Sequence, residues 1–229
     1  MPRIWGLFSD MPIGSQFISH LPFFKPRLRI ALLGFIAWVA LSFPCFSVVW
    51  ADGRPTVAVK STIDQVLVVL GDQALKDPTK RDERRTKLEE IIGQRFDYEE
   101  MAKRTLAAEW KKIDAAQKQE FVGLFKQFMA HSYAGNIDGY SGEQVEYGKE
   151  RIKGKFAEVQ TTVISPKAKI PLNYRLLKKN EEWRVYDVII DGVSLMKNYR
   201  GQFSRIIKSS SFDGLLDKLR SKAKQRASS

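Results

Sequence analysis

The chain has few of the residues and motifs that enzymes use for chemistry. Its 229 residues include one cysteine, Cys45, and two histidines. His131 is the only histidine after residue 50, and a lone histidine lacks the second ligand that a metal site needs. The sequence contains no Gly-x-Ser-x-Gly elbow, no glycine-rich phosphate loop and no His-Glu-x-x-His motif. We therefore expect no enzymatic activity, no cofactor and no metal.

The first 51 residues have the layout of a secretory signal peptide. Lys25, Arg27 and Arg29 form a basic flank, an apolar run follows over residues 30–50, and Val49-Trp50-Ala51 offers small residues at the −3 and −1 positions of a cleavage site. The run is also about long enough to span a bilayer, so an uncleaved anchor is the alternative. Cleavage after Ala51 predicts a mature, exported domain of residues 52–229. That domain has no cysteine, hence no disulfide and no thiol nucleophile.

The charge of the chain is strongly positive. The formal net charge is +12 at pH 7, with 38 Lys and Arg against 26 Asp and Glu. A basic exported domain suggests anionic partners such as lipid headgroups, a membrane face or an acidic protein. Export from the cytoplasm argues against nucleic acid as the partner.

The hydrophobic pattern divides the mature chain into a helical half and a strand-rich half. Apolar residues recur at helical spacing over residues 56–140, alternate over 143–190, and return to helical spacing after Gly192. The alternating stretch contains four segments joined by short turns, which predicts an antiparallel meander. We expect an α+β domain, in which a twisted antiparallel sheet of about four strands has helices packed on one face and encloses an apolar pocket.

An aromatic stripe marks the helix that we expect to begin after Asp114. Phe121, Phe125 and Phe128 fall on one helical face, and Tyr133 continues it. The simpler interpretation is packing in the core, and the functional one is that the stripe forms a wall of an apolar cavity. The sequence leaves both open.

Asp187 and Asp191 are the most suggestive pair of carboxylates. They lie four residues apart on the last expected strand, so strict alternation would point both to the same side, as an acid–base pair requires. The favoured interpretation is structural. Asp191-Gly192 forms a turn in which Asp191 caps a helix starting at Val193, and Asp187 accepts hydrogen bonds from nearby backbone.

Three segments resemble the MlaC family of periplasmic phospholipid-binding shuttles. They are Asp-Ala-Ala-Gln-Lys-Gln-Glu-Phe-Val-Gly-Leu-Phe-Lys-Gln-Phe ending at Phe128, the pattern W-x-V-Y-D-V-x-x-D-G-V-S-L-x-x-x-Y-x-x-x-F over residues 183–203, and the closing stretch over residues 203–216. In the last segment Ser211-Phe212 replaces the Gly-hydrophobic pair usual in the family. The order and spacing of these short motifs carry the resemblance, which spans nearly all of the mature chain.

The resemblance implies a soluble periplasmic carrier that acts as a monomer. Such a protein passes phospholipid between an outer-membrane lipoprotein–porin complex and an inner-membrane ABC transporter, and so maintains the lipid asymmetry of the outer membrane. A similar branch of the family accompanies hopanoid synthesis, so a hopanoid is an alternative ligand. A non-lipid interaction module, or an enzyme on a similar cone-shaped fold, are the remaining alternatives.

A carrier of this kind needs an apolar cavity for acyl chains, and the sequence offers candidates for its wall. They come from the aromatic stripe, from one face of the last strand and from the segment after Gly192. On that strand, strict alternation places either Val185 with Ile189 or Val188 with Ile190 in the pocket. The expected lining residues are Phe121, Phe125, Phe128, Tyr133, Val185, Val188, Ile190, Val193, Met196, Tyr199 and Phe203.

Overall fold

The computed structural model describes residues 53–166 and 168–227, with the backbone alone for 133–138 and 225–227. The predicted signal peptide, residues 1–51, lies outside the described residues. Five α-helices are described: α1 (Pro55–Gly71), α2 (Arg81–Arg95), α3 (Tyr98–Leu106), α4 (Ala115–Asp138) and α5 (Leu195–Ala227). Three short 3₁₀ turns accompany them: η1 (Ala74–Lys76), η2 (Pro78–Lys80) and η3 (Ala107–Lys111).

A five-stranded antiparallel sheet follows the first four helices. Its strands occur in chain order: β1 (Gln144–Lys153), β2 (Phe156–Ile164), β3 (Lys169–Lys179), β4 (Glu182–Ile190) and β5 (Val193–Ser194). The α+β class and the antiparallel meander are confirmed. The fifth strand was not expected, because its two residues are too few to show an alternating pattern.

Local side-chain caps explain where several helices begin. At the start of α4, Gln117 N–H donates to Asp114 Oδ1 at 2.8 Å and Asp114 N–H donates to Gln117 Oε1 at 3.2 Å, a reciprocal capping box. At α3, Asp97 Oδ1 accepts from Glu100 N–H at 3.0 Å. These caps satisfy backbone donors that have no partner inside the helix.

The turn after β4 differs from the expectation for Asp191. Asp191 is exposed with φ +49°, and α5 is instead capped by Ser194, whose Oγ accepts from Lys197 N–H at 3.1 Å. Asp187, which is buried, accepts from Ser194 Oγ at 2.7 Å and from Met196 N–H at 3.1 Å. Asp187 therefore orders the start of α5, as the structural interpretation expected. The cap moved to Ser194 because Val193 and Ser194 add a strand to the sheet before the helix begins.

The helix α5 is interrupted at Ser211, where φ is +72° and ψ is 174°. Ser211 Oγ accepts from Gly214 N–H at 3.3 Å and so caps the final segment. The run of three serines at residues 209–211 therefore ends one helical segment and caps the next.

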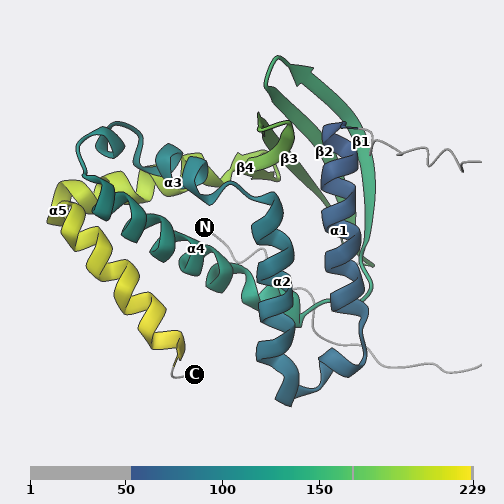
Figure 1. Cartoon of the computed structure of the whole chain (residues 1–229). Coiled ribbons are helices and arrows are strands. Elements are labelled where there is room, and N and C mark those ends of the chain that lie inside the picture. The colour runs from purple at the N-terminus through teal and green to yellow at the C-terminus, as the bar shows by residue number, and fades with distance from the viewer. Residues whose placement is uncertain (1–52, 167, 228–229) are drawn as a thin grey trace, which may run out of the picture. The chain divides into compact units, whose positions relative to one another are not determined.

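The helices divide into two groups with separate apolar cores. Figure 1 shows α1 and α2 side by side, with α1 packed against β1 and β2. Helices α3, α4 and α5 pack on one another. Their shared core contains the fully buried rings of Phe121 and Phe125 together with Phe203 from α5. The space between the sheet and the helices α2 and α4 is where the candidate site lies.

Candidate functional site

An apolar cavity of about 300 Å³ lies between the sheet and the helices α2 and α4. Its charged lining residues are Arg85 and Glu89. The others are almost entirely apolar or aromatic: Leu88 and Ile92 from α2, Phe96 and Tyr98 around the start of α3, Met129 and Ala130 from α4, Leu172 and Tyr174 from β3, Val188 and Ile190 from β4, and Leu195 from α5. A concave, largely apolar site of this kind is the usual form of a small-molecule pocket.

A second apolar cavity of about 150 Å³ adjoins the first on the same side of the sheet. It lies between α1 and α2, and Val59 and Val185 are among its lining residues. Ile92, Phe96 and Tyr174 line both cavities. The two cavities therefore share these three residues as a common part of their walls.

A β-bulge decides which residues of β4 face the helices. The register along β4 advances from Val185 to Asp187 while β3 moves by one residue, from Leu176 to Arg175. The extra residue, Tyr186, shifts the alternation by one position. As a result Val185, Val188 and Ile190 all line the two cavities, whereas strict alternation would have separated Val185 from the other two. Ile189 is buried but lines neither cavity.

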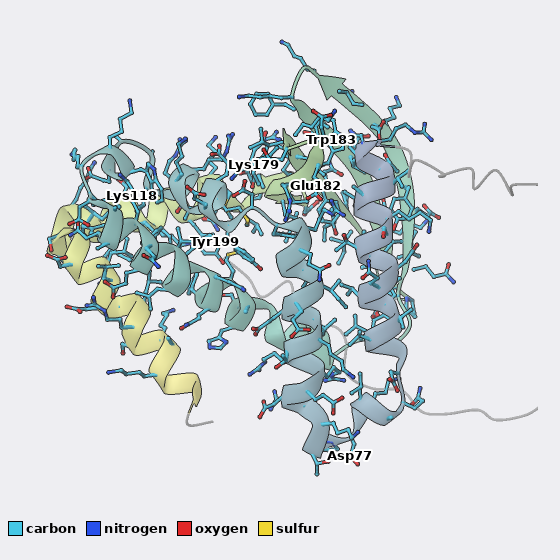
Figure 2. All side chains as sticks on the ribbon, in the orientation of Figure 1. Asp77, Lys118, Lys179, Glu182, Trp183 and Tyr199 are labelled. Carbon is cyan, nitrogen blue, oxygen red and sulfur yellow. The ribbon has the colours of Figure 1, made fainter. Side chains whose placement is uncertain are left out.

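The aromatic residues expected in the pocket lie in the helical core instead of the cavity wall. The rings of Phe121 and Phe125 are 6.0 Å apart, and Phe203 meets Phe125 edge-on at 6.3 Å. Phe128 is half-buried, and its ring meets the ring of Tyr199 edge-on, with 5.2 Å between the ring centroids. Tyr199 is labelled in Figure 2. Met196 is buried in the same hydrophobic cluster, together with Tyr199, Phe203, Phe121 and Phe125.

Two further predicted residues, Val193 and Tyr133, remain to be placed. Val193 is 57% exposed and lies on β5, paired with Ile190, instead of on the inner face of a helix. The side chain of Tyr133 lies outside the described part of the chain. For all of these residues a role in lipid binding stays a prediction. Among the predicted residues whose side chains the structure describes, Val185, Val188 and Ile190 line the two cavities.

Most of the cavity-lining residues were missed by the sequence interpretation. They come from α1, α2, the start of α3, α4, β3 and the start of α5, and those of α2 and β3 illustrate the reason. Leu88 and Ile92 form the apolar stripe of α2, and Leu172 and Tyr174 alternate on β3. Both patterns are visible in the sequence and predict buried faces. Neither pattern indicates a cavity. The apolar stripe of α2 is short and surrounded by charged residues, and its aliphatic side chains cannot be distinguished in the sequence from ordinary core residues.

Burial affects the tyrosines of the site. It raises the pKa of Tyr98 to about 12, with Glu89 adding to the effect, and it also raises the pKa of Tyr174. Desolvation disfavours the charged phenolate, so both hydroxyls stay neutral at physiological pH. The cavity thus offers neutral aromatic surface to a ligand.

The described segments contain neither a membrane-spanning helix nor a cluster of metal ligands. In residues 53–166 and 168–227, none of the helices is both long enough and apolar enough to cross a bilayer. The same part of the chain brings together no group of three metal-ligating side chains.

The sequence matches the MlaC protein family over residues 60–221, well over half of the chain. The chain belongs to the MlaC family. The intermembrane phospholipid transport system binding protein MlaC of Haemophilus influenzae is 24% identical over 183 residues, which are 76% of this chain and 85% of that protein. The toluene tolerance protein ttg2D of Pseudomonas putida is 27% identical over 134 residues, 57% of this chain and 61% of that protein.

A solved structure shares this MlaC-family fold. It is the phospholipid-binding protein of Ralstonia solanacearum in complex with a phospholipid, with a TM-score of 0.68 and 26% sequence identity. The likeness covers 76% of this chain and 99% of that one. The sheet and helices that enclose the apolar cavities therefore belong to an arrangement in which another protein holds a phospholipid.

Proposed function

We propose that this protein is a periplasmic phospholipid carrier. The observation that supports this most strongly is the pair of adjoining apolar cavities between sheet and helices, in a fold like that of a protein solved with a bound phospholipid. Each buried CH₂ group of an acyl chain contributes about 0.8 kcal/mol, so a lined apolar space holds a lipid without any charged contact. The proposal assigns no catalytic reaction to the protein.

The carrier would exchange lipid between the two membranes of the envelope. We place its partners at an outer-membrane lipoprotein–porin complex and an inner-membrane ABC transporter, where the exchange maintains outer-membrane lipid asymmetry. Membership of the MlaC family supports this proposal, as does the similarity to the intermembrane phospholipid transport system binding protein of Haemophilus influenzae. Residues 1–51 would act as the signal peptide, removed after Ala51, and the mature domain would work as a monomer.

Native mass spectrometry of protein released from the periplasm without detergent tests the proposal. The expected result is a monomer of residues 52–229 that carries phospholipid, which solvent extraction then identifies. A hopanoid in the extract would replace the proposed ligand with the alternative one. A folded protein that arrives empty and takes up no phospholipid from vesicles would refute the carrier function and favour an interaction module.

A further inference from the structure

A charged cavity of about 440 Å³ lies beside the apolar one, between the β3–β4 turn and the segment that joins α2 to α3. Its charged lining residues are two cations, Lys179 and Arg184, and two carboxylates, Asp97 and Glu182. Lys179 and Glu182 lie at the end of the sheet next to that segment (Figure 2). The proposed function assigns no role to this cavity.

The four charges already form two ion pairs, one between Lys179 of β3 and Asp97 and one within β4. Lys179 Nζ lies 3.3 Å from Asp97 Oδ2, and Arg184 Nη2 lies 2.7 Å from Glu182 Oε2. Lys179 is also 3.8 Å from Glu99 Oε2. The side chains of Lys179 and Glu182 are 52% and 60% exposed, whereas their partners Asp97 and Arg184 are 7% and 33% exposed. The exposed member of each pair can therefore exchange its partner for a ligand group at small cost.

Two aromatic residues connect the charged cavity with the apolar one. Phe96 and Tyr98 line both, and their ring centroids are 6.2 Å apart. Asp97 lies between them in sequence, and its carboxylate pairs with Lys179. A single short segment thus borders an apolar space on one side and a charged space on the other. A phospholipid is divided in the same way, because its acyl chains match the apolar cavity and its charged headgroup matches the charged one.

We infer that the charged cavity binds the headgroup of a zwitterionic phospholipid, with its phosphate at Lys179 and Arg184 and its ammonium group at Glu182 and Asp97. This inference rests on the proposed function, because it requires acyl chains in the adjoining apolar cavity. A zwitterion replaces both internal ion pairs with new pairs of the same kind. An anionic headgroup such as phosphatidylglycerol supplies no cation for the carboxylates and meets a cavity whose four charges sum to zero, so it gains less Coulomb energy.

Competition between two headgroups in one vesicle tests the inference. The purified protein is emptied of lipid and incubated with vesicles of equal phosphatidylethanolamine and phosphatidylglycerol, and the bound lipids are extracted and counted by mass spectrometry. We expect wild type to be enriched in phosphatidylethanolamine relative to the vesicles. Exposed charge contacts are worth up to about 1 kcal/mol, so the enrichment should be roughly two- to fivefold.

Two variants should move the bound ratio in opposite directions. Glu182→Gln leaves the cavity with a net positive charge and should raise the share of phosphatidylglycerol, whereas Lys179→Met leaves it negative and should lower that share. A general loss of structure cannot produce shifts of opposite sign. Lys178→Met and Glu181→Gln are matched controls, because these two residues lie in the same turn, pair with each other at 2.5 Å and do not line the cavity.

The outcomes separate this inference from the function on which it rests. If wild type takes up no lipid at all, the carrier function fails and the headgroup site fails with it. If wild type loads lipid in the vesicle ratio, and neither variant changes that ratio, the carrier function stands and the headgroup site is refuted.

Discussion

Filling the apolar cavity should abolish lipid loading while leaving the fold intact. Ala130 lies on α4 and lines the cavity of about 300 Å³, so Ala130→Phe would direct a ring into existing space. The ring adds six carbon atoms and displaces a similar number of acyl methylene groups. At about 0.8 kcal/mol for each buried CH₂, the loss is at most about 5 kcal/mol, or between roughly three and four orders of magnitude in affinity. A lipid that shifts within the cavity and keeps some of these methylene groups buried would lose less binding free energy.

The assay is phospholipid uptake from vesicles, measured by native mass spectrometry on protein whose folding has been checked by circular dichroism. Ala116→Phe is the matched control, because Ala116 lies on the same helix, is exposed and does not line the cavity. The buried ring should leave the free energy of unfolding of Ala130→Phe equal to or above that of wild type. A folded Ala130→Phe variant that loads phospholipid as wild type does would refute the placement of acyl chains in this cavity.

Two further predictions concern the core and the tyrosines. Phe121→Ala should lower the free energy of unfolding by about 3–5 kcal/mol, because the ring is fully buried. Urea unfolding measures this loss, and a variant as stable as wild type would contradict the close packing of the ring. Burial raises the pKa of Tyr98 from 10.0 to about 12, so the unfolded chain ionises first and stability should fall as pH rises from about 10 to about 12. Tyr98→Phe should make urea unfolding midpoints less pH-dependent in that window, and an unchanged slope would argue against a buried Tyr98.

Much of the secondary structure follows from local signals in the sequence. The alternation over residues 182–190 predicts β4 with the bounds that the structure has, and Asp97 with two acidic residues in the next turn predicts α3. The capping box of Asp114 and Gln117 marks the start of α4. These signals are readable because caps and side-chain periodicity depend on residues a few positions apart.

The face of β4 that meets the cavity could not be read in the same way. Both alternatives assumed strict alternation, and the bulge at Tyr186 made each of them partly right: Val185 shares a face with Val188 and Ile190. A bulge depends on how the strand pairs with its neighbour. It therefore leaves no mark in the pattern of a single strand.

The sequence by itself determined which helix faces are buried. The tertiary structure decided whether the side chains of a buried face pack against other side chains or border a cavity. The aromatic stripe of α4 and the weaker stripe of α2 both predict buried faces, but Phe121 and Phe125 fill their surroundings with their own rings, while Leu88 and Ile92 border a cavity. Hydrophobicity reports only the free energy of removing a side chain from water, which is similar in both places. A cavity is the space left between packed elements, so its position depends on how α2, α4 and the sheet meet, which no segment of the sequence contains alone.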